Sequence, residues 1–95
     1  MIRRDGEVLA VVGPVMFNTV PDLLAEAADH IASGVRRIDF SGATEVDSAA
    51  VALALEWQRQ AGGAGGGLAL EHVPQAMQNL ARLYGVSDLL PQVAG

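Results

Sequence analysis

An aspartate and a serine, Asp47 and Ser48, stand directly before a run of seven Ala, Val and Leu residues at 49–55. Both side chains suit the start of a helix, where an oxygen that accepts from a free backbone N–H contributes about 1 kcal/mol. A phosphate on a serine at this position is stabilised by the positive end of the helix dipole. We therefore expect Asp47 or Ser48 to cap a helix, Asp47 to hold the preceding loop, and Ser48 to meet a partner or to accept a phosphate.

Other residue types that perform catalysis are too scattered to predict an active site. His30 and His72 lie far apart in the chain, with no Glu-x-x-His or other metal-ligand spacing. Possible carboxylate pairs fall at strand ends or in loops, namely Glu45 with Asp47 and Asp39 with Glu71. No serine lies in a Gly-x-Ser-x-Gly motif. The sequence predicts no enzyme, no metal and no cofactor, and an enzyme that depends on His30 or His72 is the least supported alternative.

The size and composition of the chain predict one small domain over residues 1–95. Of its residues, 51% are hydrophobic and only 4% are aromatic, so the expected core is aliphatic. The sequence contains no cysteine, which excludes disulfides and Cys-based zinc or redox sites. We identify no signal peptide and no stretch near the roughly 20 apolar residues of a membrane span. The expected location is the cytoplasm.

The charge pattern argues against two classes of partner. The formal net charge is −5, and the only adjacent basic pairs are Arg3 with Arg4 and Arg36 with Arg37. Nucleic acid and anionic lipid headgroups are both negatively charged, so we expect neither nucleic-acid binding nor direct membrane insertion. The glycine-rich segment 62–67 lacks the Lys-Ser/Thr ending of a phosphate-binding loop, and we interpret it as a flexible helix-to-strand connection.

Hydrophobic periodicity and turn residues predict the elements that must position Asp47 and Ser48. Strands are expected at 7–15, 35–42 and 67–73, with a short edge strand at 1–6 that turns at Asp5 and Gly6. Helices are expected from a Thr19 cap to Gly34, at 48–61 and from Pro74 to Gly85, followed by a short helical turn at 87–90. Strands that alternate with helices predict an α/β fold with a mixed sheet.

The helix at 48–61 has more apolar residues than one core-facing stripe requires. Ala50, Val51, Ala54 and Trp57 have the spacing of that stripe, which leaves other apolar side chains toward solvent. On the helix at 74–85, Met77, Leu80, Ala81 and Tyr84 share the expected core face, and Leu83 is in surplus. The sequence thus predicts a protein-docking surface that comprises Asp47, Ser48, Ala49, Ala52, Leu53, Glu56 and Leu83.

Two segments, "RRIDFSGATEVDSAAVALALEW" and "LARLYGVSDLLP", resemble the STAS domain of anti-sigma factor antagonists. The chain is most similar to the stand-alone MlaB-like STAS subunits of Mla phospholipid-transport ABC complexes. The resemblance implies the SpoIIAA-type α/β fold, with a mixed four- to five-stranded sheet flanked by three to four helices. It also implies that Ser48 matches the Ser/Thr that is phosphorylated in the antagonists and contacts the cytoplasmic ATPase subunit in Mla complexes.

The resemblance leaves two functions open. The first is a non-enzymatic subunit that supports the cytoplasmic ABC ATPase in maintaining outer-membrane lipid asymmetry, held near the inner membrane by that partner. The second is an antagonist of an anti-sigma factor kinase, regulated by phosphorylation of Ser48. Antagonists usually carry a glycine where this chain has Ala50, and Gly-x-Leu-Asp where it has Gly13 to Met16. Both departures favour the transporter subunit.

Overall fold

A computed structural model, which describes residues 1–62 and 67–92, contains a four-stranded sheet in the order β1-β2-β3-β4. The antiparallel pair is β1 with β2, whereas β3 runs parallel to both β2 and β4. The mixed sheet that the sequence predicts is therefore confirmed. The strand bounds are β1 Ile2–Asp5, β2 Val8–Val15, β3 Arg37–Val46 and β4 Ala69–Glu71.

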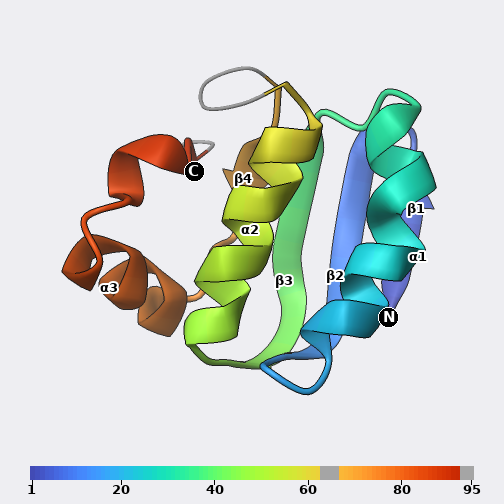
Figure 1. Ribbon diagram of the computed structural model, residues 1–95. Coiled ribbons are helices and arrows are strands. Elements are labelled where there is room, and N and C mark those ends of the chain that lie inside the picture. The colour runs from blue at the N-terminus through green and yellow to red at the C-terminus, as the bar shows by residue number, and fades with distance from the viewer. Residues whose placement is uncertain (63–66, 93–95) are drawn as a thin grey trace.

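Three α-helices and one 3-10 helix complete the described part of the chain. Their bounds are α1 Val20–Ala32, α2 Ser48–Gln60, α3 Gln75–Leu83 and η1 Ser87–Leu89. Figure 1 shows α1 and α2 side by side over one face of the sheet, with α3 beyond α2. Because α1 and α2 each follow a parallel strand, both helices begin at the carboxyl end of the sheet. Asp47 and Ser48 lie at that end.

Two strands differ in length from the prediction. The sequence predicts that the third strand ends by residue 42, but β3 continues to Val46, with Gly13 paired to Ala43 and Val15 paired to Val46. Small and polar residues at 41–45 are typical of a loop, but pairing with β2 keeps them extended. Conversely, β4 is shorter than the predicted 67–73. Of the predicted glycine-rich connection, residues 63–66 lie outside the described residues.

The core lies between the sheet and the helices. Alternate residues of the strands, such as Leu9 and Val11 on β2 and Ile38 and Phe40 on β3, are buried on the helix side. The largest fully buried side chain is Trp57 of α2, whose indole Nε1 has no hydrogen-bond partner among the described residues. The predicted aliphatic core thus also encloses the one tryptophan of the chain.

The buried arc of α2 is wider than the sequence predicts, and Leu53 is the clearest error. The sequence predicts Leu53 on the solvent side, but only 1% of its surface is exposed. Leu53 lies three residues after Ala50 and four before Trp57, so it shares their face of the helix. Since α2 contacts both α1 and α3, more than one stripe of it is covered. Leu53 is a core residue and cannot contact a partner.

Gln58 is the buried polar residue of α2, with 2% of its surface exposed. Its side-chain amide N–H donates to the Leu68 carbonyl at 2.6 Å, and its amide oxygen accepts from the Leu68 backbone N–H at 3.3 Å. Both ends of the amide are therefore satisfied by one residue, just before β4 begins. This pair of bonds joins α2 to the chain that enters β4.

Two smaller expectations are also wrong. Thr19 precedes α1, but its side chain makes no cap hydrogen bond to that helix. Its hydroxyl instead hydrogen-bonds backbone groups of the preceding loop. Tyr84 was expected on the core face of the last helix, but 54% of its surface is exposed because it lies just past the end of α3.

Candidate functional site

The candidate site is centred on the carboxylate of Asp47, which joins two segments of the chain. One oxygen, Oδ1, accepts the backbone N–H of Ala49 at 2.8 Å and so caps α2. The other oxygen, Oδ2, accepts the backbone N–H of Phe17 at 3.0 Å. The loop after β2 is thereby held against the first turn of α2, at the lower end of the molecule in Figure 1.

Ser48 is the first residue of α2 and is exposed. Its side chain makes no hydrogen bond within residues 1–62 and 67–92. The cap is therefore Asp47, and the alternative that Ser48 caps the helix is wrong. A serine hydroxyl without an internal partner at a helix N-terminus is free to hydrogen-bond a second molecule.

The outward side of α2 next to Ser48 is built from small residues. Ala52 is exposed, as the sequence predicts for this side, whereas Ala49 and Leu55 are half-buried. Small side chains allow the backbone of another protein to approach closely. With Leu53 in the core, the apolar surface that α2 offers is smaller than predicted.

Glu56 lies farther along α2 and is already paired. Its carboxylate accepts two hydrogen bonds from the Arg59 guanidinium, at 2.8 and 2.6 Å, and one from the Gln60 side chain at 3.1 Å. The hydrogen bonds from Arg59 are the main reason that the pKa of Glu56 falls to about 2. A partner that contacts Glu56 would meet an ion pair and not a single negative charge.

Phe17 belongs to the same end of the molecule, although no sequence pattern described above indicates it. Its side chain is 82% exposed. The turn that carries Phe17 is fixed by Thr19, whose hydroxyl oxygen accepts the Met16 backbone N–H at 2.9 Å and donates to the Pro14 carbonyl at 2.9 Å. The available signal was a large aromatic residue in a loop, between a Gly-Pro and a helix start, where no periodic pattern requires it.

An open hollow lies beside this loop. Its volume is about 390 Å³, and it is lined by Met16, Ala43, Thr44, Glu45, Val46, Pro74 and Ala76. Glu45 is exposed and makes no ion pair or hydrogen bond among the described residues. We call Phe17, Asp22, Glu45, Asp47 and Ser48 the acidic edge, because three of these five side chains are carboxylic acids and all lie near the carboxyl end of the sheet.

Leu83 is separate from the acidic edge. It is exposed, as predicted, to 77% of its surface, but it is the last residue of α3. The first turn of α3 lines the hollow through Ala76, and seven residues at 1.5 Å each put Leu83 about 10 Å farther along the helix axis. Leu83 therefore does not belong to the surface around Ser48.

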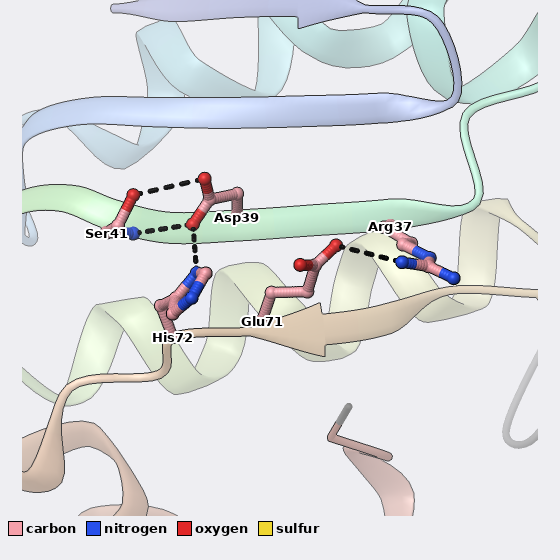
Figure 2. A network of polar contacts seen from close by, with 5 residues as sticks. All are labelled: Arg37, Asp39, Ser41, Glu71 and His72. Carbon is pink, nitrogen blue, oxygen red and sulfur yellow. Dashed lines mark hydrogen bonds and ion pairs between the residues drawn. The ribbon is translucent and has the colours of Figure 1, made fainter. Parts of the chain in front are cut away.

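A second polar cluster lies on the side of β3 that faces away from the core (Figure 2). The Asp39 carboxylate accepts hydrogen bonds from the backbone N–H and the hydroxyl of Ser41, at 2.9 and 3.0 Å, and lies 2.9 Å from Nδ1 of His72. Arg37 and Glu71 form a neighbouring ion pair at 3.7 Å. These contacts join β3 to the end of β4.

This cluster has the residue types of a catalytic triad but not its arrangement. Nucleophile activation requires the base to contact the serine hydroxyl, whereas Ser41 and His72 here both contact Asp39. Partial burial alone would raise the pKa of Asp39, but the hydrogen bonds from Ser41 and His72 together hold that pKa below its ordinary value. The cluster is a structural contact. Among residues 1–62 and 67–92, no group of three His, Asp or Glu side chains is placed to hold a metal ion.

The family described as "Mlab, STAS domain" matches residues 1–91 of the chain. This chain belongs to the STAS-domain family. A search of curated proteins found no match to this chain.

Solved structures with the same fold as this STAS domain include SpoIIAA, an anti-sigma factor antagonist, in its unphosphorylated form. The two are 17% identical with a TM-score of 0.70, and the alignment covers 99% of this chain and 87% of SpoIIAA. A candidate anti-sigma factor antagonist from Thermotoga maritima is 12% identical with a TM-score of 0.74, over 100% of this chain and 86% of that one. The Bacillus cell fate determinant SpoIIAA in its phosphorylated form is 19% identical with a TM-score of 0.65, over 99% and 90%.

At these identities the neighbours establish the fold of the STAS domain and nothing further. They confirm the predicted SpoIIAA-type architecture. In the part of the chain that the structure describes, no helix has both the length and the apolar character needed to cross a bilayer. What the site offers chemically is a free hydroxyl, an exposed aromatic ring and unpaired carboxylate charge. Groups of these types can hydrogen-bond, pack against or form an ion pair with another molecule.

Proposed function

We propose that this STAS domain is a non-enzymatic subunit of an Mla-type phospholipid-transport ABC transporter. In this role it binds the cytoplasmic ATPase subunit through the first two turns of α2 and supports the assembly and activity of that subunit. The observation that carries the proposal is the free Ser48 hydroxyl beside small outward residues, on a chain that the MlaB STAS family matches over residues 1–91.

Close packing at Ser48 is physically reasonable because little side-chain volume stands in the way. Ala49 and Ala52 bring the surface of α2 near its own backbone, so a partner helix or loop can approach closely. Asp47 keeps the helix tip and the Phe17 loop in one arrangement, which lowers the entropy cost of docking. Such a subunit would reside in the cytoplasm and reach the inner membrane only through its partner.

Two surface variants test the docking face. We expect Ser48→Asp and Ala49→Arg to fold normally and to weaken binding of the purified ATPase subunit at least tenfold, because each introduces a charge at the predicted contact. Isothermal titration calorimetry measures the binding, and the rate of ATP hydrolysis by the ATPase subunit is the second readout. The matched control is Ala32→Arg. Ala32 is an exposed alanine at the C-terminal end of α1, away from Ser48. An ATPase subunit that is fully assembled and active without this chain would contradict the proposal.

The exposure of Ser48 also favours a second candidate, an anti-sigma factor antagonist controlled by phosphorylation. A phosphate on the Ser48 oxygen would lie at the positive end of α2, close to free backbone N–H groups. Incubation with the cognate anti-sigma factor kinase and ATP, followed by mass spectrometry, tests this role. Phosphate on Ser48 that disappears in Ser48→Ala supports the second candidate, and an unmodified protein rejects it.

A further inference from the structure

Phe17 is the most exposed of the large apolar side chains in the described part of the chain, with 82% of its surface exposed. Exposure of this kind has no benefit for folding, since burial of an aromatic side chain is strongly favourable. The loop around Phe17 is nevertheless well ordered by hydrogen bonds, through Thr19 on one side and Asp47 on the other. An aromatic side chain on a fixed loop loses little further entropy on binding, which is typical of interface hot spots.

The charges near Phe17 all have one sign. Residues 14–26, 41–56 and 73–81 contain no Arg or Lys. Asp22 and Asp47 have structural reasons to be acidic, because each lies at the N-terminal end of a helix. Glu45 has no such reason, since it lies near the end of β3 and lines the open hollow without a partner among the described residues. Its charge is available to a second molecule.

The arginines of the sheet lie toward the opposite end of the parallel strands. Arg3 and Arg4 pair with Ala10 and Leu9 in the first half of β2, and Arg37 starts β3. At that end Arg36 and Arg37 pair with Glu7 and Glu71, so the charges there are mixed in sign, whereas those of residues 14–26, 41–56 and 73–81 are all acidic. This separation makes one end selective for a partner of positive charge.

We infer that Phe17 and Glu45 are the two recognition residues of the acidic edge, and that the partner is a protein surface with an apolar pocket for Phe17 and a neighbouring Arg or Lys that enters the hollow to pair with Glu45. The inference rests on the proposed function and specifies which chemistry the ATPase subunit must present. A membrane surface is disfavoured because anionic headgroups would be repelled. A second copy of the chain is disfavoured because two acidic edges would face each other.

The test is calorimetric titration of the purified Mla-type ATPase subunit of the same organism with the full chain. We expect Phe17→Ala to weaken binding at least about 30-fold, as for an interface hot spot. We expect Glu45→Lys to weaken it about tenfold or more, and Glu45→Gln to reduce the dependence of the affinity on salt. The matched control is Leu83→Ala, because Leu83 is 77% exposed and lies away from the acidic edge, and it should change the affinity less than twofold.

The outcomes separate this inference from the proposed function. If the wild-type chain does not bind the ATPase subunit, the proposed function is wrong and the inference falls with it. If binding is lost in Ala49→Arg but Phe17→Ala behaves like Leu83→Ala, the proposed function stands and the inference is overturned. Phe17-dependent dimers of the chain in sedimentation, or Phe17-dependent binding to vesicles with anionic lipid, would also overturn it. Circular dichroism melts within about 2 °C of the wild type establish that the variants are folded.

Discussion

A single carboxylate, that of Asp47, stabilises the start of α2 and orients the Phe17 loop. Replacing it with alanine removes the hydrogen bonds to the backbone N–H groups of Ala49 and Phe17. We expect Asp47→Ala to lower the free energy of unfolding by about 1–2 kcal/mol, mostly through loss of the cap. Urea unfolding followed by circular dichroism measures this change.

The neighbouring serine is the control for Asp47. Since the Ser48 side chain makes no hydrogen bond within the described residues, Ser48→Ala should change the free energy of unfolding by less than about 0.5 kcal/mol. Equal losses in the two variants would show that Ser48 shares the capping role. If Asp47→Ala lowers the free energy of unfolding and Ser48→Ala does not, any effect of Ser48→Ala on partner binding is a direct effect on the interface.

Sequence reasoning at the residue scale found Asp47 and Ser48 because helix capping is a local interaction with a clear chemical signature. It missed Phe17, because exposure of a loop side chain depends on what the rest of the fold places next to it. Leu53 was misplaced for a related reason. The period of a helix gives the angle of each residue but not the width of the buried arc, and that width depends on the contacts of α2 with α1 and α3.

At the scale of elements, α2 depends on Gln58 for its attachment to the chain entering β4. We expect Gln58→Leu to lower the free energy of unfolding by about 1–3 kcal/mol, because the buried N–H and carbonyl of Leu68 would both lose their partner. Chemical denaturation of the purified variant tests this. The control Gln60→Leu changes an exposed residue of the same helix and should have little effect. If Gln58→Leu left the free energy of unfolding unchanged, the two hydrogen bonds would contribute no net stability.

Element positions were largely predictable, but element lengths were less so. Alternation of apolar residues and turn signals located all four strands and three helices near their observed positions. The extension of β3 to Val46 was not predictable, because the residues at 41–45 gain their extended conformation from pairing with β2. The hollow at Glu45 depends on that extension and on the start of α3, so no local pattern indicated it.

At the scale of the whole molecule, acid should weaken the fold partly through Asp39. The pKa of Asp39 in the folded state is below its ordinary value of 3.8, so ionised Asp39 stabilises the native protein at neutral pH. That contribution should decline as the pH falls through about 4 toward the folded-state pKa. We expect Asp39→Asn to be less stable than the wild type by about 1 kcal/mol at pH 7, and the difference to shrink at pH 3.

Urea denaturation at both pH values measures the Asp39 effect. The control is Glu26→Gln, since Glu26 is an exposed carboxylate with no ion pair among the described residues. It should leave the pH dependence unchanged. A difference between Asp39→Asn and the wild type that stays constant from pH 7 to pH 3 would contradict the assignment of the stabilising charge to Asp39.

The burial of Trp57 has a practical consequence for all of these measurements. Trp57 is the one tryptophan of the chain, and its side chain is fully buried. It lies nine residues after Ser48, or about 14 Å along the axis of α2. Its fluorescence in the native protein should therefore be shifted to short wavelength and should change sharply on unfolding, while remaining insensitive to a molecule that docks at the acidic edge. Trp57 fluorescence can then report whether the domain is folded in the same sample in which an independent signal follows binding of the partner.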